Sequence, residues 1–380
     1  PRPPPHPQHR TAARPRPPRR AGTPAGHLGT DSAKQCHRSR RGEGGWVGLG
    51  MNSTQLAAME PMPLIEALSP NHSFTRTNFM DDKGNEAEAT QERTLAIIRT
   101  SPTTGYYMDV FRSKSALPNE FHDYLYHNIG DDLQFLNTNL KLTADENRYM
   151  ASASKEWKQN GKYRNPGWHF FKEVQTSSEY KDDVTARFEI SQLEDGKNRY
   201  MNLFILGNQN REYTKVKAPI TYEAPKPYNT TMTPTLVIRQ KGEAWTNPFA
   251  VIYEPTFDAK SKNGIQSVEK LAIDGVFKGF KVTSKIDNKL IKQYIINQDK
   301  NSTFENKELA FSFTGSYAVI TFDAVNKLQS IYVGEGMSFS AKNVSIQSKD
   351  NLPMAAYLDF SIATPETKTS ENANIIFSKK

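Results

Sequence analysis

The sequence predicts an all-β fold of antiparallel β-sandwich type, made of two stacked or continuous β domains behind a disordered N-terminal tail. Short segments rich in aromatic and β-branched residues recur along the chain, and clusters of Gly, Asn, Asp and Pro separate them. The composition changes abruptly near Met51, because the residues before it are rich in Pro, Arg and Gly. The rest of the 380-residue chain is long enough for two domains.

Residues 1–50 are predicted to be a disordered Pro/Arg-rich tail that is foreign to the folded protein. The tail holds ten basic and two acidic residues, so it accounts for the net charge of +8 and leaves 39 residues of each sign elsewhere. A segment of this composition buries too little apolar surface to offset its ordering entropy. A natural basic arm is the alternative. Because the remaining chain has no net charge, nucleic-acid binding by it loses its main electrostatic argument.

Other broad features of the sequence narrow the class of protein. The only cysteine, Cys36, lies in the tail, so no disulfide is expected in the folded part. The tail lacks the apolar core of a signal peptide. The sequence contains no run of about twenty apolar residues, so no membrane span is predicted. There is no Gly-rich phosphate loop, G-x-S-x-G elbow or H-E-x-x-H motif, which argues against those enzyme classes.

The first β-sandwich domain is predicted over residues 51–260. Its strands are expected at 94–100, 105–112, 121–127, 133–137, 184–191 and 199–206, with a strand–turn–strand unit at 234–255. The spacing of the first three strands predicts an antiparallel meander. A short helix is expected at 145–157, and the Pro-bearing stretch 207–233 is expected to be a long loop.

The second, smaller β domain is predicted over residues 261–380, after a boundary near 255–264. Strands recur there roughly every ten residues, as in β-sandwiches. They are expected at 265–273, 277–284, 290–296, 308–314, 317–323, 328–334 and 338–346. Turn residues such as Asp274-Gly275 and Asp287-Asn288 separate them.

A candidate metal set lies in the segment 105–128: Asp109, Asp123 and His127. Strand alternation places Asp109 on one face of its strand, and Asp123 with His127 on one face of the next strand. If these two strands pair, carboxylates and an imidazole come together, which are ligands that zinc accepts. The alternative is a buried, hydrogen-bonded Asp–His pair that orients an aromatic layer, and the absence of close His spacing favours it.

Five residues are candidate polysaccharide ligands: Trp168, His169, Arg211, Arg239 and Trp245. Sugars stack on exposed aromatic rings through their apolar C–H faces, and arginine binds carboxylates or sulfates in a bidentate manner. The alternatives are structural. Trp168 would then plug one end of the sandwich, and the charged residues would form surface salt bridges that contribute little stability.

The run TLAIIRTSPTTGYYMDVFRSKS, followed by HDYLYHNIGD, resembles the heparinase II/III-like polysaccharide lyases. The later runs NPGWHFFKE, NREYTKV and PTLVIRQKGEAWTNPFAVIYEP extend the resemblance over residues 55–365. It implies an N-terminal helical toroid joined to C-terminal β-sandwich domains, which cleave uronic-acid polysaccharides by β-elimination. It also implies a structural zinc ion held by His and Asp in the first sandwich.

The sequence departs from this family in one respect. The toroid with its catalytic Tyr and His would need hundreds of residues before Met51, and the family's His-Gly-His run is absent. No catalytic residue is therefore assigned.

The chain is accordingly predicted to be the C-terminal β-sandwich part of an exported bacterial polysaccharide lyase, periplasmic or extracellular, and to be inactive by itself. Its expected partners are an acidic polysaccharide and the missing toroid, with no nucleic acid and no membrane span. A non-catalytic carbohydrate-binding or adhesion protein is the alternative. A glycoside hydrolase with two paired carboxylates is a weaker one.

Overall fold

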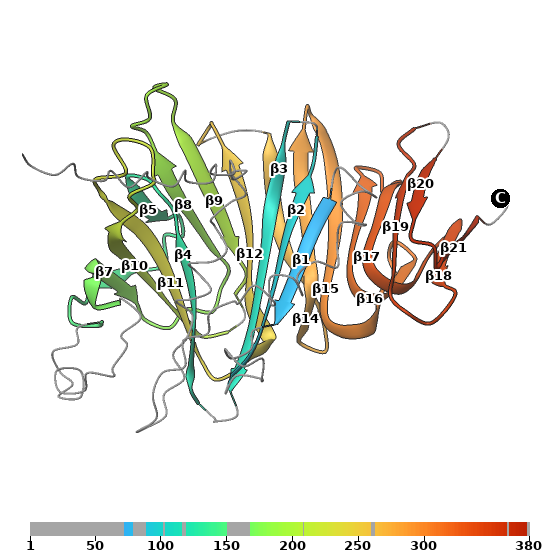
Figure 1. The fold of residues 1–380 in the computed structure, drawn as a ribbon, viewed down its shortest axis with the longest axis horizontal. Helices are drawn as coiled ribbons and strands as arrows, with labels where there is room; N and C mark the ends of the chain where they lie inside the picture. Colours follow the sequence, from blue (N-terminus) through green and yellow to red (C-terminus); the bar gives the residue numbers. More distant parts are fainter. Residues whose placement is uncertain are drawn as a thin grey trace, which may run out of the picture.

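The structure is a computed structural model that describes residues 72–78, 89–101, 103–115, 119–149, 168–207, 209–259, 263–362 and 365–377. Their strands form three antiparallel sheets, which lie side by side as layers (Figure 1). The prediction of an all-β antiparallel fold is therefore confirmed. The predicted tail, residues 1–50, lies outside the described residues.

Two of the sheets form a sandwich built from the first part of the chain. The seven-stranded sheet contains, in spatial order, β1 (His72–Asn78), β2 (Ala89–Arg99), β3 (Gly105–Ser115), β12 (Ala244–Thr256), β9 (Arg199–Ile205), β8 (Val184–Ile190) and β5 (Asp132–Phe135). The five-stranded sheet contains β4 (Phe121–His127), β11 (Met232–Lys241), β10 (Arg211–Ile220), β7 (Lys172–Ser177) and β6 (Leu142–Ala144).

The third sheet has nine strands and uses only residues after Asn263. Its main path is β13 (Gly264–Ile273), β14 (Val276–Ile286), β15 (Lys289–Asn306), β16 (Phe311–Asp323), β17 (Leu328–Ala341), β18 (Val344–Ser348) and β21 (Ala373–Phe377). Two further strands branch from β17: β19 (Met354–Asp359) and β20 (Glu366–Thr369). The change of sheet falls between Thr256 and Gly264.

The seven-stranded sheet is the middle layer, and its central strands are buried on both faces. Phe111 and Val251 belong to the core that the five-stranded sheet covers. Val110 and Ile252, one position away on the same strands, belong to the core shared with the nine-stranded sheet. Because successive side chains of a strand point to opposite faces of the sheet, each of these strands contributes side chains to two cores. Full burial of such side chains stabilises the fold by about 1.5–3 kcal/mol each.

Two outer cores complete the layers. The nine-stranded sheet curls so that its other face packs against its own later strands around Phe313 and Leu358. The outer face of the five-stranded sheet is covered by Tyr149, Trp168 and Phe171. Trp168 begins a 3₁₀ turn, η2 (Trp168–Phe170).

The predicted meander of three strands is wrong at its third member. β2 and β3 form the expected hairpin, closed by the bond from the Thr100 amide to the Thr104 carbonyl. β4 then leaves this sheet and pairs with β11 in the five-stranded sheet. The loop between β3 and β4 is long enough for the chain to cross from one sheet to the other. β4 therefore pairs where its aromatic side chains become buried, and not with the strand that precedes it in the sequence.

The stretch 207–233 is not the single long loop that was expected, because it contains the ten-residue strand β10. Its buried positions alternate with polar ones, and the prolines lie after its paired core. In the nine-stranded sheet, the expected strands at 308–314 and 317–323 are one continuous strand, β16. Most of the expected helix at 145–157 lies outside the described residues.

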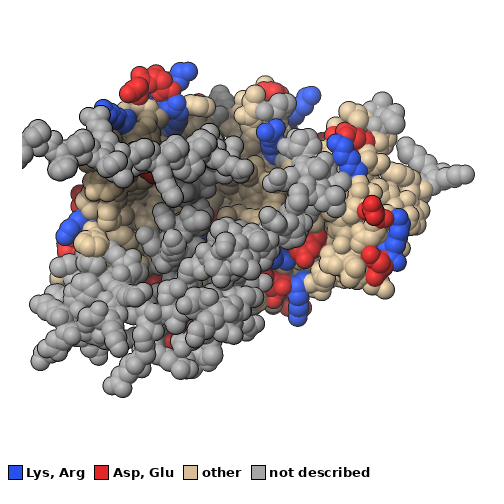
Figure 2. Space-filling model, in the orientation of Figure 1, with Lys and Arg blue, Asp and Glu red and all other residues tan. Residues whose placement is uncertain are grey.

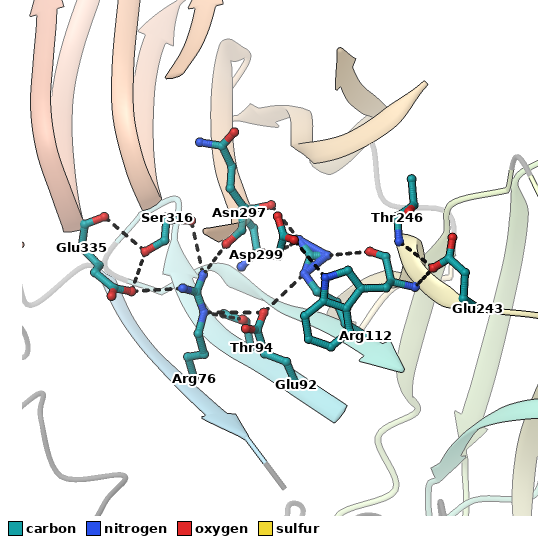
Figure 3. Close-up of polar contacts among 12 residues, drawn as sticks. Arg76, Glu92, Thr94, Arg112, Glu243, Thr246, Asn297, Asp299, Ser316 and Glu335 are labelled. Carbon is teal, nitrogen blue, oxygen red and sulfur yellow. Dashed lines mark hydrogen bonds and ion pairs between the residues drawn. The ribbon is translucent and has the colours of Figure 1, made fainter. Parts of the chain in front are cut away.

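A buried charged network joins the seven-stranded sheet to the nine-stranded sheet (Figure 3). Arg112 of β3 has its Nε 3.3 Å from a Glu92 carboxylate oxygen, and its Nη2 donates to the carbonyl and side-chain oxygens of Asn297, each at 3.0 Å. Burial lowers the pKa of Arg112 to about 10, against the opposing effect of Glu92 and Asp299. A buried cation of this kind is tolerated only because its donors find acceptors.

Arg76 of β1, the edge strand of the seven-stranded sheet, also lies between this sheet and the nine-stranded sheet (Figure 3). Its Nη1 lies 3.1 Å from Glu335, and its Nη2 donates to the carbonyl oxygens of Gln298 and Ser316 at 2.9 and 3.4 Å. Both carbonyls lie where the pairing of β15, β16 and β17 shifts register. Because bulges leave carbonyl groups outside the ladder, the guanidinium satisfies groups that would otherwise be buried without a partner.

The visible surface agrees with the charge balance of the sequence. Figure 2 shows lysine and arginine side chains interspersed with aspartate and glutamate along this face. The mixture gives the described part of the face no extended region of one sign. Within the described ranges, no helix is long and apolar enough to cross a membrane.

The first prediction concerns His72, which is buried against the rings of Tyr332 and Tyr357. Burial lowers the pKa of His72 from 6.5 to about 4. The unfolded chain therefore takes up this proton first as pH falls, and stability present above pH 6.5 is lost toward pH 4. His72→Phe should reduce that loss by up to about 3 kcal/mol, measured by urea unfolding across this range. An unchanged pH dependence would contradict the assignment.

Candidate functional site

Asp109, the first predicted metal ligand, is buried inside the sandwich and paired with Arg93 of β2. Arg93 donates to both carboxylate oxygens, through Nε at 2.9 Å and Nη2 at 2.5 Å. The Tyr124 hydroxyl donates to the same carboxylate at 2.6 Å and also bonds the Tyr253 hydroxyl. Burial first, and Asp109 beside them, raise the pKa of both tyrosines, which therefore stay protonated. The carboxylate orients an aromatic layer, as the alternative interpretation expected, with arginine rather than histidine as its partner.

The other two predicted ligands lie on the opposite face of β4. Because Tyr124 faces Asp109, the neighbouring Asp123 faces away from it. Asp123 accepts two bonds from Arg239 of β11, at 2.7 and 2.8 Å, and His127 Nδ1 lies 2.7 Å from the Thr235 hydroxyl.

The predicted metal set is therefore not brought together, since β4 pairs with β11 and not with β3. Over the residues that the structure describes, no group of three His, Cys, Asp or Glu side chains is placed to hold a metal ion. Zinc binding stays a prediction.

Two of the predicted polysaccharide ligands are part of the covered outer face of the five-stranded sheet. Trp168 is only 6% exposed and packs against Tyr149 and Phe171. The Arg239 guanidinium lies 5.9 Å from the Trp168 ring and is held by Asp123. Both side chains are engaged in packing rather than open to a ligand. His169 lies in the same turn, and its side chain is outside the described residues.

Arg211 is fully buried at one end of the sandwich, where it joins several strand ends. Its guanidinium donates to the carbonyl oxygens of Leu206 at 2.9 Å, Asn247 at 3.0 Å and Pro248 at 2.8 Å, and to Gln240 Oε1 at 3.0 Å. The ring of Phe249 lies 4.8 Å from it. Burial lowers the pKa of Arg211. Its partners are neutral, so Arg211 is a structural cation that fixes strand ends and not an open anion ligand.

The strand ends that Arg211 fixes surround a polar hollow of about 720 Å³. The hollow is lined by Asn119, Glu179, Lys181, Asp182, Gln209, Asn210 and Lys241. These residues come from the connections β3–β4, β7–β8 and β9–β10 and from the last residue of β11, which meet because all of them lie at the same end of antiparallel strands. We call this site the polar hollow.

The walls of the polar hollow are held rigidly. The backbones of Tyr180 and Arg211 exchange two hydrogen bonds, at 2.9 and 3.1 Å. The Gly207 amide donates to Asp183 Oδ1 at 2.7 Å. A Cβ at Gly207 would lie 2.3 Å from the Lys181 carbonyl, so only glycine allows the two loops to approach this closely.

The chemistry of the polar hollow suits a hydroxyl-rich ligand that carries anionic groups. Three amide side chains offer donors and acceptors to hydroxyl groups. Lys181 and Lys241 are exposed, and no carboxylate of the described residues lies within 4.0 Å of either ammonium group. Glu179 and Asp182 can accept bonds from sugar hydroxyls, but they also limit how much negative charge the site can hold.

Trp245, the fifth predicted ligand, lies at the same end but belongs to the seam with the nine-stranded sheet. Its indole N–H donates to Asp299 at 2.9 Å, and the Lys114 ammonium lies 4.4 Å from its ring centre. Glu243 accepts the backbone amides of Trp245 and Thr246 at 2.5 and 2.9 Å (Figure 3). The pKa of Asp299 is lowered, since the bond from Trp245 and the charge of Arg112 outweigh the effect of burial.

The sequence pointed to Arg211 and Trp245 at this end of the sandwich, but it did not single out lining residues such as Lys181, Asp182 and Gln209. Their only signal was position, because each lies in a polar connection between two expected strands. Knowledge of the strand pairing would have placed these connections at one end of the sandwich. That pairing includes strand β10, which was not predicted.

Comparison with known proteins shows what the chain is similar to. Residues 265–360 match the model of a family described as the endo-acting ulvan lyase C-terminal domain. Over 301 residues, the chain is 37% identical to an endo-acting ulvan lyase of Formosa agariphila. That alignment covers 78% of this chain and 35% of the relative, so the chain spans about a third of the length of the curated protein it matches. The matches support a place among the polysaccharide lyases, whereas the heparinase II/III-like assignment stays a prediction.

The second prediction tests Arg211 as the residue that builds the polar hollow. Arg211→Met leaves three buried carbonyl oxygens without donors, and each such group costs about 1–3 kcal/mol. The free energy of unfolding should therefore fall by at least about 3 kcal/mol in urea titrations. Lys241→Met, at the exposed wall of the same site, is the matched control and should stay within about 0.5 kcal/mol of wild type. Equal stability of the two variants would contradict the structural role.

Proposed function

We propose that the chain is the C-terminal, glycan-contacting part of an exported polysaccharide lyase that cleaves a uronic-acid-containing polysaccharide by β-elimination, with ulvan as the candidate substrate. The observation that carries the proposal is the 37% identity to an endo-acting ulvan lyase, which extends over most of this chain. The polar hollow supports it, because amide and lysine side chains suit an anionic sugar. Export is proposed because a polymer of this kind is encountered outside the cytoplasm.

The proposed reaction needs a base that removes the C5 proton of the uronate and an acid that protonates the departing oxygen. It also needs a group that neutralises the carboxylate, since only then is the C5 proton acidic enough. Lys181 and Lys241 can supply such a positive charge at the polar hollow. Their role would be to bind and orient the polysaccharide beside the reacting groups.

The acid and base are proposed to come from outside the described residues. Every described tyrosine whose pKa is shifted is shifted upward, mainly by burial, which opposes formation of a tyrosinate base. His72 and His122 have lowered pKa values and are neutral, but they are only 5% and 7% exposed. In the heparinase II/III-like proposal, an N-terminal helical toroid supplies the missing groups.

Non-catalytic glycan binding is the second candidate function. The observation that favours it is the polar hollow itself, which offers hydrogen-bonding and cationic groups but has no histidine or tyrosine among its lining residues. The two candidates share the ligand and differ only in whether this chain works beside a catalytic domain.

The third prediction is that the chain alone binds ulvan without cleaving it. Because no histidine or tyrosine lines the polar hollow, no unsaturated uronate should form there, and the ultraviolet absorbance of a mixture with ulvan should stay constant. Alginate and heparin serve as further uronate polymers in the same assay. Steady growth of the absorbance on any of them would show that the chain carries its own catalytic residues.

The fourth prediction places the sugar at the polar hollow. Replacing Lys181 and Lys241 together by alanine should weaken ulvan binding about fivefold, at roughly 0.5 kcal/mol for each exposed ion pair. Affinity electrophoresis in gels that contain ulvan measures the change. The matched control replaces Lys327 and Lys342, exposed lysines in turns of the nine-stranded sheet. If both double variants lose affinity equally, only net charge matters and the site is misplaced.

A further inference from the structure

The end of the sandwich opposite the polar hollow carries two arginine–aromatic pairs. β9 runs from Arg199 at this end to Ile205 near the hollow, and the β8–β9 hairpin rises above the sheets there (Figure 1). The Arg187 guanidinium lies 5.4 Å from the ring centre of Tyr200, and the Arg199 guanidinium lies 5.7 Å from that of Phe257. We call these four residues the rim patch.

The two pairs meet at the turn that follows β12. Thr256 is the register partner of Tyr200, so the pairs flank the last rung of the β9–β12 ladder. Arg187 Nη2 donates to the Ala259 carbonyl at 3.0 Å, which ties the first pair to the turn that presents Phe257. The Thr256 hydroxyl accepts the Asp258 amide at 3.2 Å and so fixes that turn.

Phe257 is 69% exposed, although it is anchored by a strand end and a guanidinium. Single exposed apolar rings are common on protein surfaces, and what distinguishes Phe257 is that the Arg199 guanidinium contacts it beside the Arg187–Tyr200 pair. The neighbouring Arg199 is kept in position by Asp195, with Nη2–Oδ2 and Nη1–Oδ1 distances of 2.5 and 3.3 Å.

Arg187 differs from the other ordered arginines of the sandwich in its partners. Arg93, Arg112 and Arg239 pair with carboxylates. Arg187 is held by Asn202 Oδ1 at 2.7 Å and by a carbonyl oxygen, both neutral, and no described carboxylate lies within 4.0 Å of it. Unlike Arg211 it is only half-buried. Its charge acts on the nearby Glu254, where it opposes the burial that raises the pKa of that carboxyl, but no direct ion pair with a described carboxylate occupies the guanidinium.

From these contacts we propose that the rim patch is a second, non-catalytic binding surface for an anionic polysaccharide. The exposed ring of Phe257 takes the apolar C–H face of a sugar. The planar guanidinium of Arg187, already oriented by its neutral partners, binds a sulfate or carboxylate group of the same chain. The choice of ligand rests on the proposed function, whereas the location rests on the contacts of these residues alone.

The position of the rim patch gives it a role in holding long chains. The seven residues of β9 separate it from the connections of the polar hollow, which is about 20 Å at the rise of a strand. A polymer that engages both sites gains effective concentration at each of them, and a short oligosaccharide does not. The rim patch thus favours polymeric over short ligands.

The test compares three variants of the full chain by affinity electrophoresis, with ulvan as the charged probe and dextran as an uncharged one. Phe257→Ala and Arg187→Gln should each weaken ulvan binding about fivefold, as expected for loss of a contact of roughly 1 kcal/mol. Tyr222→Ala removes an aromatic ring that is 80% exposed and lies outside the rim patch, so its affinity should equal that of wild type. None of the proteins should be retarded by dextran.

The outcomes separate the two proposals. Loss of affinity in the two rim variants, with wild-type Tm values, supports the rim patch. Unchanged affinity in Phe257→Ala overturns it, whatever the stability of Arg187→Gln, because Phe257 is exposed and its removal should not affect folding. Loss at Lys181 and Lys241 without loss at the rim leaves the proposed function standing and rejects this inference. Failure of the wild-type chain to bind ulvan rejects both.

Discussion

The burial of the seven-stranded sheet on both faces is the constraint on which the rest of the structure depends. A sheet with one solvated face can place its charged residues on that face. In their central parts, strands β3 and β12 have no such face, because the five-stranded sheet covers one side and the nine-stranded sheet the other. Each charged side chain on these strands must therefore find a partner within the protein or pay a large desolvation cost.

This constraint explains the two charged networks on β3. Asp109 faces the sandwich core and is neutralised by Arg93, whereas Arg112 faces the seam and is met by Glu92 and Asn297 (Figure 3). The two networks point in opposite directions from one strand, as alternation requires. They do not offer a ligand an open site, since both are buried and their charges are paired within the protein. They fix how the sheets pack on one another. A shifted packing of the sheets would leave these buried polar groups without partners, which costs free energy.

The two proposed binding sites accordingly lie at the ends of the sandwich, where connections leave the sheets. At one end the buried cation of Arg211 draws carbonyl groups together and gives the polar hollow its fixed walls. At the other end Arg187 and Phe257 remain accessible on a turn that is bonded to the sheet. A rigid sandwich with ligand contacts at both ends suits a long polymer better than a small molecule. It also leaves room for a catalytic partner domain to supply the reacting groups.

The sequence by itself determined the β class, most strand positions and the absence of net charge after the tail, because these follow from local patterns of period two and from composition. It also identified the residue types of interest. The tertiary structure decided their roles: Arg211, predicted to bind substrate, is buried as a structural cation, and Asp109 is separated from Asp123 by a sheet. Local patterns cannot report which strands become neighbours, since strand pairing depends on burial across the whole chain. For the same reason Lys181 entered the candidate site only when the connections were brought together.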